Sequence, residues 1–181
     1  PEKGAMSYVS GGRESCACGC HGSGPVVMVK SVSSKKEAGI GIGAHPGVAD
    51  LMGFGRRNEV VSPEGAKAYT VYQISALGGM CRAQGMKLQH GKPHGALYNM
   101  AAKDYELSLA ICEAIKEYDP DLIVMGLSGS ETIRAAKDCG LKAASEVFAD
   151  RGDEEDGSLV NRRKEGAFIR DEDEAIARVI R

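Results

Sequence analysis

Short β-rich runs and amphipathic helical stretches alternate along this chain. The clearest helix spans residues 104–118, where leucine, isoleucine and alanine recur at helical spacing on one stripe. The continuous apolar run at 122–127 is typical of a buried strand. The other strands are predicted at 15–20, 40–44, 87–92 and 142–148, and the other helices at 25–38, 62–85, 130–139 and 171–181.

Start and stop signals support several of these helices. Ser62 caps a helix that has Pro63 in its first turn, and Asp171 caps the helix at 171–181, with Glu174 three residues later. Glycines at positions 39, 85 and 140 end helices at the places where the periodicity stops.

Five strand-then-helix units in a row predict an α/β fold in which helices cover a parallel sheet. At 181 residues the chain has the size of a single domain, residues 1–181. The pattern is compatible with a closed barrel and with an open, doubly wound sheet. In both, the polar residues that follow the strands meet at one edge, where such folds place their sites.

Composition narrows the classes of partner. Hydrophobic residues at 43% and charged residues at 27% are ordinary globular values. The net charge of −2 favours neither nucleic acid nor an anionic membrane, and the longest apolar run is far too short for a spanning helix. Three of the six cysteines fall in helix-like segments, which indicates a reducing, cytoplasmic setting rather than a disulfide framework.

All four histidines of the chain lie at or just after the ends of predicted strands, together with other polar residues. This shared position favours a functional edge of the sheet over scattered structural histidines. The residues in question are His21, His45, Asp50, His90, Lys92, His94, Ser128, Ser130, Glu146, Asp150 and Arg151.

Four strings of residues resemble the LamB/YcsF family, which includes the A subunit of 5-oxoprolinase. They are HPG at 45–47, GFGRR at 53–57, KPHGALYN at 92–99 and EVFADR at 146–151. The last two are long and specific, and the resemblance covers nearly the whole chain.

The resemblance implies a distorted (β/α)₇ barrel similar to the polysaccharide deacetylase-like fold. It also implies a cytoplasmic hydrolase that opens 5-oxoproline to L-glutamate with cleavage of ATP, together with subunits B and C. A homo-oligomer is left open.

The family's opening DLNCDLGE-like string and closing HGDNP-like string are not found, so we expect this chain to lack the first and last strands of the barrel. Gly24 stands where the family has an aspartate, and Gly91 replaces an apolar residue.

Opening a lactam requires an activated carbonyl carbon, a base and proton transfer. We assign catalytic roles by side-chain chemistry: Lys92 to an anionic oxygen, His94 or His45 to proton transfer, and Glu146 or Asp150 to the base. Arg151 is assigned to the substrate carboxylate, which it can hold bidentately. The further substrate-binding candidates are His21, Asn99 and Asp50.

The nucleotide site is less evident, because the chain has no phosphate-binding loop string. Gly129 and Ser130 begin a predicted helix, where free N–H groups favour a phosphate. The alternative function is a metal-dependent carbohydrate deacetylase-like hydrolase or a non-catalytic binding relative, so a divalent metal ion is left open although no metal ligands are assigned. The C-x-C spacing of Cys16, Cys18 and Cys20 favours packing cysteines over a structural zinc site.

Overall fold

The computed structural model describes residues 12–180, in which strands and helices alternate as the sequence predicts. The strands are β1 (Arg13–Ala17), β2 (Gly41–His45), β3 (Leu88–Gly91), β4 (Ile123–Leu127) and β5 (Lys142–Glu146). The helices are α1 (Pro25–Glu37), α2 (Pro63–Ala83), α3 (Gly95–Ala101), α4 (Tyr105–Tyr118), α5 (Glu131–Asp138) and α6 (Glu172–Ile180).

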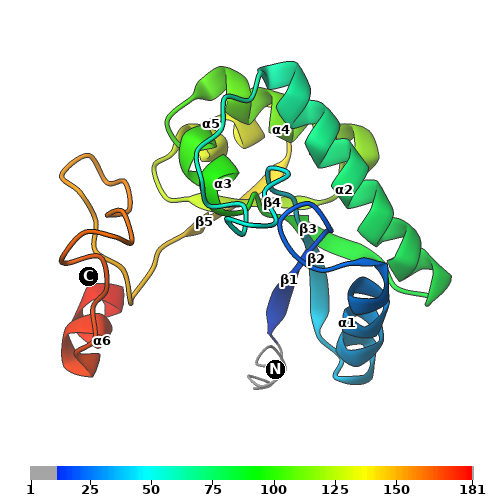
Figure 1. Cartoon of the computed structure of the whole chain (residues 1–181), viewed down its shortest axis with the longest axis horizontal. Helices are drawn as coiled ribbons and strands as arrows, with labels where there is room; N and C mark the ends of the chain where they lie inside the picture. Colours follow the sequence, from blue (N-terminus) through cyan, green and yellow to red (C-terminus); the bar gives the residue numbers. More distant parts are fainter. Residues whose placement is uncertain (1–11, 181) are drawn as a thin grey trace.

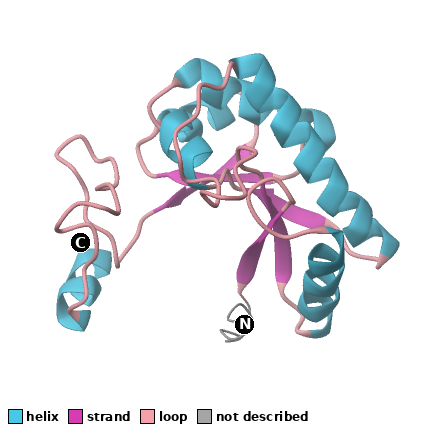
Figure 2. Cartoon of the chain, in the orientation of Figure 1, coloured by secondary structure: helices cyan, strands magenta, loops and turns pink. Residues whose placement is uncertain are grey.

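The five strands form one parallel sheet in the order β1-β2-β3-β4-β5. Helices α1, α2, α4 and α5 lie side by side in chain order and pack over one face of it (Figures 1 and 2). Each crossover therefore moves the chain one strand further in the same direction. A doubly wound sheet reverses its strand order and carries helices on both faces, so that alternative is wrong for the described strands. The closed seven-stranded barrel stays a prediction.

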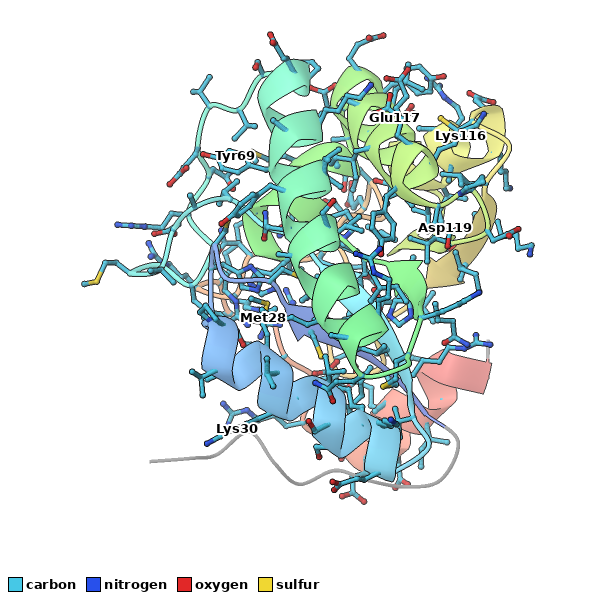
Figure 3. The ribbon with its side chains drawn as sticks, turned by 90° about the vertical axis from the view of Figure 1, so that its right-hand side faces the viewer. Met28, Lys30, Tyr69, Lys116, Glu117 and Asp119 are labelled. Carbon is cyan, nitrogen blue, oxygen red and sulfur yellow. The ribbon has the colours of Figure 1, made fainter. Side chains whose placement is uncertain are left out.

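The hydrophobic core lies between this helix layer and the sheet. In α1, the buried Met28 and the exposed Lys30 lie on opposite sides of the helix, and α2 runs beside α4 in the same view (Figure 3). The stripe predicted on the helix at 104–118 is confirmed, because it is buried along α4. The largest fully buried apolar side chains are Val32, Ile42, Val48, Ile74, Leu77, Leu97, Ile111, Ile115 and Leu122.

Side-chain caps fix where the helices begin. The Ser62 hydroxyl accepts a hydrogen bond from the Gly65 N–H at 3.1 Å, and the Asp104 carboxylate accepts one from Leu107 at 3.0 Å. Ser130 caps α5 in the same way. The caps predicted at Ser62 and at Asp171, whose carboxylate accepts from the Glu174 N–H, are confirmed.

The structure differs from the predicted elements in three places. The helix α3 was not predicted, because its seven residues are too few to show a period and its N-cap residue, His94, makes no side-chain cap. Strand β1 begins and ends earlier than the predicted 15–20, since Gly19 turns the chain with a φ of +98°. Strand β5 ends at Glu146 rather than at residue 148. The predicted last residue of the final helix, 181, lies outside the described residues.

A β-bulge in β3 decides which side chains face away from the helices. Ile42 pairs with Leu88 but the next residue, Gly43, pairs with His90, so Gln89 is an extra residue in the ladder. Both Gln89 and His90 consequently point to the inner face, opposite the helices. They lie against Gly41 and Gly43, where any Cβ would collide with them.

Beyond β5, residues 147–171 leave the sheet and run as a loop to α6, drawn from orange to red in Figure 1. Two isolated antiparallel bridges, Arg151 with Phe168 and Asp153 with Leu159, organise this segment. Lys103 at the end of α3 pairs with Asp156 at 2.9 Å and ties the segment to the helices. Within the described residues, no helix has the length and apolarity needed to cross a bilayer.

Two adjacent glycines of α2 give a test of the α2–α4 packing. A Cβ at Gly78 would overlap the phenol of Tyr118 on α4, whereas a Cβ at Gly79 would meet nothing within 4 Å. We expect Gly78→Ala to lower the free energy of unfolding by about 1–3 kcal/mol. Gly79→Ala should raise it by about 0.5–1 kcal/mol, because alanine is the better helix former. Urea denaturation followed by circular dichroism measures both, and equal effects would contradict the packing.

Candidate functional site

The carboxyl edge of the sheet collects most of the polar residues singled out in the sequence. His45 is the last residue of β2 and Glu146 the last of β5. Lys92 and His94 follow β3, and His21 lies in the loop after β1. The expectation that residues after successive strands meet at one edge is met for these five.

Three histidine rings form the centre of this edge. The rings of His21 and His94 are stacked, with centroids 3.8 Å apart and planes 5° from parallel. The His45 ring meets His94 edge-on at 4.7 Å, and its Nε2 lies 3.0 Å from His94 Nδ1. Phe54 packs its ring against the edges of His21 and His94. Both of those histidines are buried.

Backbone carbonyls anchor the outer nitrogens of the His45–His94 pair. His45 Nδ1 donates to the Lys92 carbonyl at 2.6 Å, and His94 Nε2 donates to the Phe54 carbonyl at 2.8 Å. A carbonyl only accepts, so both of these nitrogens carry hydrogen. The two remaining nitrogens, His45 Nε2 and His94 Nδ1, face each other without a hydrogen, so a hydrogen bond between them needs one further proton. The pair is thus arranged to take up one proton.

Burial opposes that charge. It lowers the pKa of His45 to about 3, helped by the neighbouring His94, and it lowers the pKa of His21 to about 4. The pKa of His94 is lowered for the same reason, with Arg56 and Lys92 nearby. The three imidazoles are therefore neutral at pH 7. Their low pKa values make these rings weak bases at pH 7, so a proton placed between His45 and His94 is readily passed on to another group.

Beside the histidines, Lys92 forms an ion pair with Glu146, and both side chains are about four-fifths buried. The other carboxylate oxygen of Glu146 accepts a hydrogen bond from the Tyr98 hydroxyl at 3.1 Å. The Lys92 ammonium also lies 5.8 Å from the Tyr98 ring centroid and 5.5 Å from that of Phe148. A cation, an anion and two aromatic rings thus line this part of the edge.

The fourth histidine, His90, lies further inside the sheet. Its Nε2 reaches Ser15 Oγ at 2.9 Å across Gly43, whose missing side chain makes room for the ring. Burial lowers the pKa of His90 to about 4. His90 pairs with Gly43, two residues before His45 along β2, so its buried ring lies further from the strand ends than the cluster of the other three histidines.

Asp50 is buried in the loop after β2 and is held within that loop. Its carboxylate forms an ion pair with Arg57 and accepts the Gly53 N–H at 2.8 Å. The Arg57 guanidinium lowers the pKa of Asp50 to about 2. The same loop carries the Phe54 carbonyl that accepts the hydrogen bond from His94, so the Asp50–Arg57 ion pair helps to fix the position of that carbonyl.

The other residues assigned from the sequence lie outside the histidine cluster and the Lys92–Glu146 pair. Arg151 is buried and donates to the carbonyls of Ala167 and Val160, which ties the loop beyond β5 together. Asp150 and Asn99 are exposed. Gly129 and Ser130 precede α5 at the carboxyl end of β4. Their assigned roles in substrate and phosphate binding stay predictions.

The cysteines pack rather than pair. Cys16 and Cys18 belong to the hydrophobic core, and all six cysteines are free thiols. Across the described residues, no group of three or more histidine, cysteine, aspartate or glutamate side chains is arranged to hold a metal ion.

Known proteins share both the sequence and the fold. The model of the LamB/YcsF family matches residues 3–181. The chain belongs to the LamB/YcsF family. It is 60% identical over 176 residues to the A subunit of the Clostridium beijerinckii 5-oxoprolinase, and 55% identical over 165 residues to that of Bacillus licheniformis. These matches cover 97% and 91% of this chain but 68% and 65% of the relatives.

A solved structure has the same architecture. The crystal structure of a lactam utilization protein from Thermus thermophilus superposes with a TM-score of 0.86 at 41% identity, covering 93% of this chain and 68% of that one. The resemblance drawn from the four strings is therefore confirmed. The chain spans about two thirds of the length of the relatives it matches.

Three aromatic residues of the site escaped the residue-by-residue interpretation of the sequence. Tyr98 lies within the KPHGALYN string, and its position four residues after His94 indicates the site only once α3 is known. Phe54 and Phe148 belong to two of the other strings, and their rings were not assigned a role. The sequence interpretation selected polar residues that follow strands, and this criterion does not select aromatic residues that line a site.

The buried neutral histidines give a pH dependence of stability. The pKa of His90 falls from 6.5 to about 4 on folding, so the unfolded chain binds more protons below pH 6.5. Acidification from pH 6 to 4 should lower the free energy of unfolding by up to about 1.4 kcal/mol per pH unit for each such histidine. Replacing His90 by Gln should make that slope shallower. Urea denaturation at pH 6, 5 and 4 tests this, and identical slopes would contradict it.

Proposed function

We propose that this chain forms the catalytic part of the A subunit of an ATP-dependent 5-oxoprolinase, which hydrolyses 5-oxoproline to L-glutamate with subunits B and C. One observation carries the proposal: the Lys92–Glu146 pair lies at the same sheet edge as the His45–His94 pair. The site thereby combines a charge for an anionic oxygen with groups that move protons. The names of the relatives, and a lactam utilization protein of the same fold, support a cyclic amide as substrate.

Hydrolysis of a lactam is slow because resonance stabilises the amide. Transfer of the γ-phosphoryl group of ATP to the amide oxygen would leave ADP and make the carbonyl carbon a good electrophile. Water then adds to that carbon and gives up one proton to a base. The C–N bond of the ring breaks, the nitrogen leaves with a proton supplied by an acid, and the product of this step is γ-glutamyl phosphate. A second water then hydrolyses this acyl phosphate, which releases inorganic phosphate and leaves L-glutamate.

Lys92 suits the anionic partner in this reaction. Its ammonium is partly buried, where electrostatic attraction to a phosphoryl or carboxylate oxygen is stronger than in water. The His45–His94 pair suits proton transfer, because the contact between its rings has a place for one proton and the low pKa of both rings favours giving that proton to the leaving nitrogen. Glu146 or Asp150 acts as the base.

The start of α5 is our proposal for the nucleotide phosphates. Gly129 and Ser130 lie there, at the same sheet edge as Lys92, and the free N–H groups of a helix start attract anions. A reaction that consumes ATP fits the cytoplasmic location expected from the cysteines.

Replacing Lys92 by Met tests the proposal, with Lys67→Met as the matched control. Lys67 also forms ion pairs, with Glu113 and Glu117, but on the surface of α2 and α4. In the assembled enzyme with ATP and 5-oxoproline, Lys92→Met should lower kcat/KM for glutamate formation by about 100-fold or more. Lys67→Met should leave it unchanged. Equal activity of the two variants would refute the role of Lys92.

A further inference from the structure

Both carboxylate oxygens of Glu146 are engaged in this structure. Oε1 pairs with the Lys92 ammonium, and Oε2 accepts the Tyr98 hydroxyl at 3.1 Å. A carboxylate oxygen that already has a cation or a hydrogen-bond donor as its partner must lose that partner before a water molecule can take its place. Glu146 is therefore not ready to act as a base in the state that the structure shows.

The Lys92 ammonium is likewise already engaged by neighbouring side chains. It lies near the rings of Tyr98 and Phe148, which attract a cation but do not neutralise it. Its ion-pair partner is Glu146. An oxyanion that approaches Lys92 must consequently compete with Glu146 for the same ammonium.

The Tyr98 hydroxyl can stay hydrogen-bonded to Glu146 while an oxyanion competes for Lys92. Tyr98 is 6% exposed on α3, and burial together with the nearby Glu146 raises its pKa above the usual range. The hydroxyl therefore remains a hydrogen-bond donor at any physiological pH. Because it binds the oxygen that Lys92 does not, it can hold the carboxylate in place after the ion pair opens.

We propose that Glu146 is a removable counter-ion of Lys92, positioned by Tyr98, and that an oxyanion binding at Lys92 releases it to act as the base. The inference rests on the proposed function and adds an order of events to it. The oxyanion is either the substrate carboxylate or a phosphoryl group. Once it is bound to Lys92, Glu146 Oε1 takes the proton from the attacking water as the water oxygen bonds to the activated carbonyl carbon. The electron pair of the C–N π bond moves to the ring nitrogen. The base is thus masked until a ligand is present.

Binding of oxyanions to the intact protein tests the competition without any turnover. Glu146→Gln keeps the shape of the side chain but removes the charge that competes for Lys92. We expect inorganic phosphate or 5-oxoproline, whichever is the oxyanion that Lys92 binds, to bind at least about five-fold more tightly by calorimetry. Glutamate formation should be lost. Unchanged or weaker binding of both ligands would overturn the proposal.

Glu113→Gln is the matched control, because Glu113 is also paired with a lysine, Lys67, but on the surface. It should change neither binding nor turnover. A gain in affinity that also appears in Glu113→Gln would reflect overall charge and would overturn the proposal as well.

The positioning role of Tyr98 has its own variant. Tyr98→Phe keeps the ring and loses the hydroxyl, so kcat should fall at least about ten-fold while KM for 5-oxoproline changes less than two-fold. Tyr105→Phe is the control, since Tyr105 donates to Asp138 at 2.9 Å on the surface and should leave kcat unchanged. A rise in KM at constant kcat would place Tyr98 in ligand binding and overturn the positioning role.

The two levels of proposal fail differently. If the wild-type complex forms no glutamate from 5-oxoproline, the proposed function is wrong, yet the gain of phosphate affinity in Glu146→Gln still reports on the competition. If glutamate forms and Glu146→Gln gains no affinity for either ligand, the function stands and the masked base is wrong.

Discussion

Parallel pairing between neighbouring strands sets the level at which each strand ends, and the site depends on that level. Ala17 pairs with His45 across β1 and β2, and Leu127 pairs with Glu146 across β4 and β5. The last residues of these strands therefore lie at one edge of the sheet. Short polar segments then add the side chains that follow β3 and those of the loop after β1. A shift of one residue in any pair would turn these side chains toward the helices.

The strand and helix order could be predicted from the sequence, because hydrophobic periodicity and capping residues are local signals. The strand order could not, since a row of βα units is compatible with an open or a closed arrangement. Helix α3 was missed because seven residues give too short a period to detect. The meeting of three of the four histidines with Lys92 and Glu146 followed from one rule about parallel strands.

The rule that residues after parallel strands meet at one edge does not predict the ion-pair or hydrogen-bond partner of each side chain. Arg151 was assigned to the substrate because its charge suits a carboxylate, and Asp50 because it follows a predicted strand. The structure shows both side chains engaged elsewhere, Asp50 by Arg57 and Arg151 by backbone carbonyls. Such pairings depend on how the long loops after β2 and β5 fold back. The role of Tyr98 likewise depends on a contact between α3 and β5 that no sequence spacing encodes.

The buried thiols have a consequence for the chemistry of the folded chain. Burial raises the pKa of Cys18 to about 12, that of Cys112 to about 12 and that of Cys81 to about 11. Only a thiolate reacts readily with alkylating agents and peroxides. These sulfurs are thus inert to electrophiles as long as the core stays closed. Oxidative damage to them would follow unfolding rather than cause it.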